Sequence, residues 1–197
     1  MLAPKILVMT GPVRAGSNNA RLAALAVKEL ALAEIEVSRV SLADYPLPLM
    51  DADAGEGGPP RAAVQLKDML VSHQGVLIVS PEYSASVTPL LKNAIDWLTR
   101  VRERNEPPYA AFKGRVFALG SASANPDGGV RGLIALRQIL EMGCGALVIP
   151  EQIAVGHADQ AFDDSDNLRD DNLAATLRAM VRRLVDLANV MPRTKDT

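Results

Sequence analysis

The chain has 197 residues, of which 48% are hydrophobic and 22% charged, with a formal net charge of −2 at pH 7. These values predict one globular domain over residues 1–197 and disfavour a nucleic-acid binder, which normally carries a basic excess. No apolar run approaches the roughly 18 residues that span a bilayer, so we expect no membrane partner. The single cysteine, Cys144, excludes an internal disulfide and suits a reducing cytoplasm. Its setting between two glycines favours a buried, inert thiol.

Apolar runs and 3.6-residue periods alternate along the chain and predict five strands and five helices. The first half is predicted to contain a strand over 5–10, a helix over 19–33, a strand over 35–42 and a helix over 61–73. The second half is predicted to contain a strand over 76–79, a helix from 89, a strand over 113–121, a helix over 130–142, a strand over 146–150 and a helix over 172–190. Thr88 is the expected N-cap of the helix that begins at Pro89.

This alternation predicts an α/β fold, a doubly wound parallel sheet with right-handed crossovers and helices on both faces. The second strand alternates apolar and polar residues, so it should lie at an edge, which favours the order 2-1-3-4-5. The order then reverses between the first and third strands. Ligands of open α/β sheets bind beyond the carboxyl ends of strands at such a point, so loops 11–19 and 81–86 should line one crevice.

Other polar stretches give weaker signals. Residues 44–60 are rich in Pro, Gly and Asp and predict a surface loop, either merely mobile or forming the rim of a site. Residues 159–171 contain six aspartates, but they lack the glycine and closing glutamate of a calcium loop. His73 is expected to close its helix, and neither it nor His157 has a neighbour that would suggest a metal site.

The first loop, 11–19, combines glycines, an arginine and short polar side chains before a helix N-terminus, where backbone N–H groups and the helix dipole favour an anion. Three interpretations remain for a phosphate-binding loop, besides a plain strand–helix turn. The glycine spacing matches a triphosphate P-loop, but Ser17-Asn18 replaces the required Lys-Ser/Thr. A dinucleotide turn needs G-x-G-x-x-G, which Pro12-Val13 breaks. A monophosphate cradle with Arg14 as its cationic clamp is the third.

Three longer motifs resemble the NADPH-dependent FMN reductase family, which includes flavin, quinone, azo-dye and chromate reductases. They are GPVRAGSNNARLA (11–23), SPEYSASVTPLLKNAIDWLTR (80–100) and SASANPDGGVRGLIALRQIL (121–140). The family's usual first loop is G-S-x-R-x-G-S-x-N and its third-strand motif is P-E-Y-N-x-S followed by L-K-N-A-I-D-W. Its fourth loop ends in Gly-Gly, as Gly128-Gly129 do. The resemblance covers essentially the whole chain and implies a flavodoxin-like fold.

The resemblance implies that the first loop holds the FMN phosphate, that residues 81–84 border the isoalloxazine and that loop 121–129 covers its other edge. The cofactor-binding residues it implies are Pro12, Arg14, Ser17, Asn18, Asn19, Pro81, Glu82, Tyr83, Ser84, Ser121, Ala122, Ser123 and Gly128. Glu82 and Tyr83 are equally interpretable as structural neighbours. Because the flavin carries the chemistry, no catalytic acid, base or nucleophile and no metal is assigned.

Three residues depart from the family pattern. Pro12 replaces a serine and removes one hydroxyl and one backbone N–H from the phosphate cradle. Ser84 replaces an asparagine beside the flavin, and Asn125 stands where glycine is common. Flavin affinity and redox tuning are therefore the properties in which this chain should differ from its family.

The expected function is two-electron transfer from NADPH (or NADH) through FMN to a small acceptor such as a quinone, free flavin, azo compound or metal oxyanion. Two alternatives remain: a flavodoxin-like electron carrier, which would normally be more acidic, and a flavin-free binding protein of the same fold. The helix over 130–142 is apolar on more than one face, and Trp97 lies off the sheet-facing stripe of its helix. Both features predict a homo-oligomer, a homodimer or a tetramer.

Overall fold

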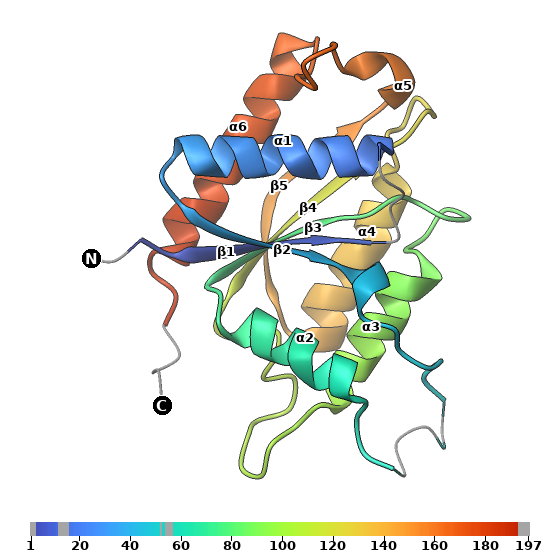
Figure 1. Cartoon of the computed structure of the whole chain (residues 1–197), viewed down its shortest axis with the longest axis vertical. Helices are drawn as coiled ribbons and strands as arrows, with labels where there is room; N and C mark the ends of the chain where they lie inside the picture. The colour runs from blue at the N-terminus through green and yellow to red at the C-terminus, as the bar shows by residue number, and fades with distance from the viewer. Residues whose placement is uncertain (1–2, 12–15, 52, 54–56, 193–197) are drawn as a thin grey trace.

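The computed structural model describes residues 3–11, 16–51, 53 and 57–192, and Figure 1 shows the arrangement of their helices and strands. The first half contains β1 (Lys5–Thr10), α1 (Asn18–Leu32), β2 (Glu36–Ser41), the 3-10 turn η1 (Leu42–Asp44), α2 (Arg61–Val71) and β3 (Gly75–Val79). The second half contains α3 (Pro89–Arg100), β4 (Val116–Ala122), α4 (Val130–Gln138), the π-helical turn η2 (Ile139–Gly143), β5 (Leu147–Val155), α5 (Ala158–Ala161) and α6 (Asp171–Ala188).

The five strands form one parallel sheet in the order β2-β1-β3-β4-β5, as predicted. Helices α1 and α6 cover one face, and α2, α3 and α4 cover the other (Figure 1). Successive side chains of β1 alternate between these layers: Ile6 and Val8 pack with α1 and α6, whereas Leu7 and Met9 pack with the other three helices. Because both faces are covered, β3 and β4 are buried at every position and β1 at every position after Lys5, so no period of two is visible in them.

Short polar side chains fix where the helices at the site begin. The Ser17 hydroxyl accepts a hydrogen bond from the N–H of Ala20 (3.3 Å) and caps α1. The Thr88 hydroxyl accepts one from the N–H of Leu91 (3.4 Å) and caps α3, with Pro89 at its first position, as predicted. At the C-terminal end of α2, the His73 ring lies 2.6 Å from the Met69 carbonyl oxygen and closes the helix.

Two predicted strand boundaries were wrong. β4 begins at Val116, not Lys113, because residues 109–114 form turns in which the N–H groups of Phe112 and Lys113 both donate to the Tyr109 carbonyl. β5 runs past Pro150 to Val155. Its pairing with β4 is interrupted by a register shift between Phe117 and Leu119, and Pro150, which has no N–H, falls in that interruption on an edge strand.

The helix predicted over 130–142 is continuous as α4 and η2, but its last turn, from Ile139 to Gly143, is π-helical, which periodicity did not indicate. The single-turn helix α5 was not predicted at all, since four residues are too few to show a period. In the part of the chain that the structure describes, no helix has the length and apolarity to cross a membrane.

The prediction that Trp97 belongs to a surface between subunits was wrong. Its side chain is 1% exposed and packs against Ala63 and Val101, under Leu47 and Met50. Its indole N–H donates to the Pro48 carbonyl oxygen at 2.7 Å. The segment after η1, which contains Leu47, Pro48 and Met50, therefore covers the side of α3 on which Trp97 lies. Helical periodicity alone indicated no partner for that side.

Candidate flavin site

The loops after β1, β3 and β4, which were predicted to line one crevice, lie at the carboxyl edge of the sheet, on the right in Figure 1. The N–H of Gly11, at the end of β1, donates to the Val79 carbonyl of β3 at 3.0 Å. A Cβ atom at Gly11 would lie 2.8 Å from the Ser80 hydroxyl oxygen, so glycine lets the two loops leave the sheet close together without moving the Ser80 side chain. The sequence-predicted site residues that the structure describes all come from these loops and the strand and helix ends beside them.

The N-terminus of α1 opens onto this edge. Pro12 and Arg14 lie outside the described residues. Ser17 caps the helix, and the backbone N–H groups of Asn18 and Asn19 donate to no other described residue. Two such N–H groups at a helix start, reinforced by the helix dipole, are a donor set suited to a phosphate.

The Asn18 and Asn19 side chains form hydrogen bonds within the protein. Asn18 Nδ2 donates to Asp159 Oδ1 of α5 at 2.8 Å. Asn19 is 5% exposed and bonds the backbone of Ala122 twice: its Nδ2 donates to the carbonyl oxygen at 2.7 Å, and its Oδ1 accepts from the N–H at 2.9 Å. Asn19 thus fastens the start of α1 to the end of β4.

The loop after β3 is built around a two-residue turn. Tyr83 and Ser86 bond each other through both backbone groups, at 3.0 and 2.9 Å, and the turn between them places Ser84 at φ 48° and Ala85 at φ 61°. Both residues are therefore in the left-handed region, which non-glycine residues enter only with strain. The Tyr83 side chain is 50% exposed, and Pro81 just before it is partly buried. The turn holds a half-exposed aromatic ring at the sheet edge.

Glu82 points into the protein rather than into solvent. Its side chain is 8% exposed. Its Oε1 accepts from Arg131 Nε at 2.9 Å, and its Oε2 accepts from the N–H of Gly132 at 3.0 Å. The carboxylate thereby joins the loop after β3 to the first turn of α4.

The predicted fourth loop begins two residues later than expected, because Ser121 and Ala122 still pair with β5 as the last residues of β4. Ser123 continues this contact, since its N–H donates to the Val155 carbonyl at 2.9 Å. Gly128 and Gly129 are buried at φ 64° and 85°, and a Cβ at Gly128 would lie 2.6 Å from the backbone of Ala154. The glycine pair thus lets this loop lie close against β5 without side chains.

One polar group at this edge has no partner among the residues that the structure describes. The Ser121 hydroxyl oxygen is fully buried, and no hydrogen bond to it is found among the described residues. Buried hydroxyls are normally satisfied. A buried donor, an anion-suited helix start and a side-chain-free glycine turn on one sheet edge fit a flat, phosphate-bearing cofactor such as FMN.

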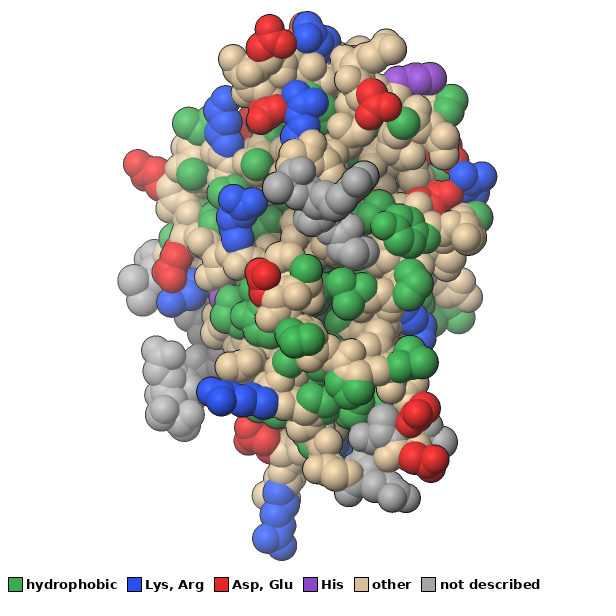
Figure 2. Space-filling view, turned by 45° about the vertical axis from the view of Figure 1, so that its right-hand side comes forward, with side chains coloured by type: hydrophobic (Ala, Val, Ile, Leu, Met, Phe, Trp, Pro, Cys, Tyr) green, Lys and Arg blue, Asp and Glu red, His purple; other side chains and the backbone are tan. Residues whose placement is uncertain are grey.

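The space-filling view turned toward this edge shows hydrophobic side chains gathered across its middle, with most charged ones toward its margins (Figure 2). A surface of this kind offers apolar contacts to a flat aromatic ring. The described residues contain no group of three or more His, Cys, Asp or Glu side chains arranged to hold a metal ion.

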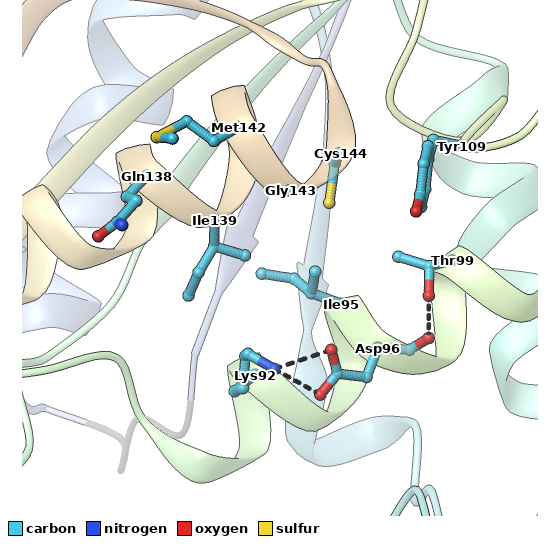
Figure 3. A pocket seen from close by; sticks show the side chains of 10 residues that line it. All are labelled: Lys92, Ile95, Asp96, Thr99, Tyr109, Gln138, Ile139, Met142, Gly143 and Cys144. Atoms are coloured by element: carbon cyan, nitrogen blue, oxygen red, sulfur yellow. Dashed lines mark hydrogen bonds and ion pairs between the residues drawn. The ribbon is translucent and has the colours of Figure 1, made fainter. Parts of the chain in front are cut away.

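A separate groove of about 490 Å³ lies between α3 and the π-helical turn η2 (Figure 3). Its lining includes Ile95, Tyr109, Ile139 and Met142, with Cys144 at its base. Burial raises the pKa of the Cys144 thiol to about 11, and the side chain is 2% exposed, which agrees with the predicted inert thiol.

Sequence reasoning missed the residues that hold the loops together. Arg131 and Gly132 of α4 donate hydrogen bonds to the Glu82 carboxylate, and Asp127 forms an ion pair with Arg131 at 2.8 Å. Asp159 accepts a hydrogen bond from the Asn18 side chain. Asp127, Arg131 and Gly132 lie within the third family motif, residues 121–140, but no single-chain pattern indicates a contact that spans 49 residues or more.

The chain is similar to known proteins over most of its length. The chain is 32% identical over 182 residues to an NAD(P)H-dependent FMN reductase of Pseudomonas aeruginosa, covering 91% of this chain and 92% of the relative. It is 35% identical over 170 residues to a quinone reductase of Pseudomonas putida, covering 84% of each. Among solved structures, the flavoenzyme NAD(P)H:(acceptor) oxidoreductase FerB of Paracoccus denitrificans superposes with a TM-score of 0.76 at 26% identity, covering 94% of this chain and 97% of FerB.

The family described as NADPH-dependent FMN reductase matches residues 4–160, which include all three loops of the crevice. The chain therefore belongs to the NADPH-dependent FMN reductase family: it has a flavodoxin-like fold and is an oxidoreductase that uses FMN as cofactor and NAD(P)H as co-substrate.

Proposed function

We propose that the crevice at the carboxyl edge binds FMN noncovalently and passes two electrons from NAD(P)H to a quinone. One observation carries the proposal: at the switch point between β1 and β3, the N-terminus of α1 and the glycine turn before α4 open onto the same edge. When bound, FMN supplies the two-electron hydride chemistry that no side chain can perform. The protein binds, orients and shields it.

The thirteen residues predicted from the family resemblance divide into three roles under this proposal. Pro12, Arg14 and Ser17, with the N–H groups of Asn18 and Asn19, hold the phosphate. Pro81, Tyr83 and Ser84 border the isoalloxazine on one side, and Ser121, Ser123 and Gly128 border it on the other. The side chains of Asn19 and Glu82, together with the backbone of Ala122, keep these groups in place.

A quinone is the acceptor that the neighbours favour, since several relatives between 30 and 37% identical are named quinone reductases. The apolar middle of the surface around the edge also suits a flat, uncharged acceptor (Figure 2). Steady-state NADPH oxidation with benzoquinones, free flavin, azo dyes and chromate, measured in parallel, tests this choice. A quinone that is reduced no faster than the other acceptors would refute it.

Binding of FMN is tested by comparing FMN with riboflavin, which lacks the phosphate. Arg14→Ala should weaken FMN binding roughly ten- to a hundredfold, because hydrogen bonds to charged groups contribute about 1.5–3 kcal/mol. Riboflavin should bind wild type and Arg14→Ala almost equally, and Pro12→Ser should tighten FMN binding by a smaller factor. Calorimetric titration distinguishes the outcomes: equal weakening of both ligands would mean that Arg14 does not bind the phosphate.

We also infer a homodimer or a tetramer in a reducing cytoplasm, with residues 1–197 acting as one FMN-binding domain. Ile134 and Met142, eight residues apart on α4 and η2, are 59% and 81% exposed, and both are large apolar side chains. Residues at this spacing share a face, and Met142 borders the groove of Figure 3. A second copy would bury this face. Light scattering should give at least twice the monomer mass, and Ile134→Glu with Met142→Glu should reduce it to that of the monomer.

A further inference from the structure

Helix α4 begins without a side-chain cap of its own. Its N-cap is Gly129, which has no side chain, and the N–H of Gly132 at the third helical position is one of the donors that a helix cannot satisfy internally. In most helices an N-cap Ser, Thr or Asp accepts from this position. Here the acceptor is Glu82 Oε2, at 3.0 Å, from a loop 50 residues earlier in the chain.

The glycines of this turn let the loop after β3 and the end of β4 approach α4 closely. A Cβ at Gly129 would collide with the Ser121 hydroxyl, and one at Gly132 would lie 3.1 Å from the Glu82 Cβ. The Glu82 side chain therefore lies flat against the first turn of α4, next to the end of β4. The two loops expected to border the isoalloxazine are joined at this point.

The charge of Glu82 is also balanced from α4. Arg131 Nη2 lies 2.7 Å from Glu82 Oε1 and 2.8 Å from Asp127 Oδ2. The hydrogen bond to Glu82, together with the charges of the two carboxylates, raises the pKa of Arg131. Arg131 is 54% exposed, whereas Glu82 is 8% exposed. Removing the arginine would leave a nearly buried carboxylate with one N–H donor and the helix dipole as its partners.

We propose that Glu82 is a positioning residue that caps α4 from the loop after β3, and that Arg131 keeps its charge from acting on the bound cofactor. The inference deepens the proposed function and rests on it for its cofactor readouts. It predicts two separable effects. The capping of the first turn of α4 depends on an oxygen acceptor at position 82. The potential and affinity of the bound FMN depend on the balance of charge between positions 82 and 131.

The geometric effect is measured without cofactor, by hydrogen exchange. Glu82→Ala should speed exchange of the Gly132 N–H by roughly ten- to a hundredfold, because a hydrogen bond to a charged acceptor is lost. Glu82→Gln keeps an amide oxygen and should retain most of the protection. Equal exchange rates in wild type and Glu82→Ala would overturn the capping role. This measurement stands even if the protein binds no FMN, which separates failure of this inference from failure of the proposed function.

The electrostatic effect is measured on the FMN-loaded protein. Arg131→Gln should lower the FMN midpoint potential, since the uncovered carboxylate opposes added electron density, and should raise the Kd of FMN roughly tenfold. The double variant Glu82→Gln/Arg131→Gln removes both charges and should return both values close to those of wild type. Lys5→Gln is the control, because it removes one positive charge of an exposed pair with Glu36 at the opposite end of the sheet. A double variant as impaired as Arg131→Gln alone would overturn the charge-balance role and point to direct contact between Glu82 and the flavin.

Discussion

The side chain of Asn19 bonds both backbone groups of Ala122, at 2.7 and 2.9 Å, across 103 residues of sequence. It connects the first residues of α1 to the last residue of β4 and leaves neither backbone group of Ala122 unsatisfied. The link joins two of the elements proposed to hold the phosphate and the isoalloxazine. A residue that family resemblance assigns to the cofactor therefore has both ends of its side chain amide bonded to the protein itself.

Asn19→Ala should lower the free energy of unfolding by about 2–4 kcal/mol, because two buried backbone groups lose their partner. Asn19→Asp should be nearly as unfavourable, since a carboxylate oxygen would face the Ala122 carbonyl. Urea unfolding measures both. Asn18→Ala, which removes an exposed hydrogen bond to Asp159, is the control and should change stability by less than about 0.5 kcal/mol. If Asn18→Ala were as destabilising as Asn19→Ala, the Ala122 contact would not be the source of the effect.

The parallel sheet, its order and the edge at which the three loops lie were predictable, because apolar runs such as 76–79 and capping residues such as Thr88 carry local signals. The contacts between loops were not. Nothing near Trp97 in sequence indicates that Pro48 will cover it, and nothing near Glu82 indicates α4. Pairings of this kind depend on which loops the sheet brings together, and periodicity carries no information about them.

The segment around Pro48, which covers Trp97, leads to a second prediction. The Pro48 carbonyl accepts from both Trp97 Nε1 and Asn93 Nδ2, at 2.7 and 2.9 Å, and Asn93 Oδ1 accepts from the N–H of Met50 at 2.8 Å. Trp97→Phe removes one of two donors to the same carbonyl, so it should cost only about 0.5–1.5 kcal/mol beyond repacking. Trp97→Ala should cost about 3–5 kcal/mol, because it leaves a cavity under the segment.

The double variant Trp97→Phe/Asn93→Ala should cost more than the sum of its parts, since the Pro48 carbonyl then loses both donors. Denaturant unfolding of the four proteins gives the coupling energy. Strictly additive losses would show that the two side chains do not share the Pro48 carbonyl in solution.

His73 makes stability depend on pH. Burial is the largest influence and lowers its pKa below the ordinary 6.5; Lys5 and Arg115 lower it further, while the Met69 carbonyl and Glu36 partly oppose them. As pH falls through 6.5, the unfolded chain takes up a proton before the folded protein does. Stability should therefore be complete above pH 6.5 and fall as the pH drops from 6.5 toward the lower pKa of the folded state.

His73→Asn should flatten this part of the stability profile, as measured by urea unfolding between about pH 7.5 and pH 5. His157→Asn serves as the control, since that side chain is exposed, and it should keep the decline. An unchanged decline in His73→Asn would assign the effect to another group.

The strained turn at Ser84 and Ala85 separates backbone conformation from cofactor contact. Both residues are left-handed, at φ 48° and 61°, and an L-residue there costs roughly 1–2 kcal/mol relative to its relaxed conformation. Ala85→Gly removes that strain but enlarges the entropy of the unfolded chain, so the net gain should be about 0.5–1 kcal/mol. Asparagine tolerates the left-handed region better than serine, so Ser84→Asn should also stabilise the protein.

The two substitutions should differ in their effect on FMN. Ser84→Asn also places a longer amide arm, the side chain usual in this family, beside the position proposed for the isoalloxazine, whereas Ala85→Gly adds no polar group. We therefore expect Ser84→Asn to tighten both FMN and riboflavin severalfold, because the amide would contact the ring that the two ligands share, and Ala85→Gly to leave both affinities nearly unchanged. Thermal unfolding without ligand measures the first effect, and calorimetric titration measures the second. Equal tightening by both variants would mean that affinity follows the relief of backbone strain, and that position 84 makes no contact of its own with the flavin.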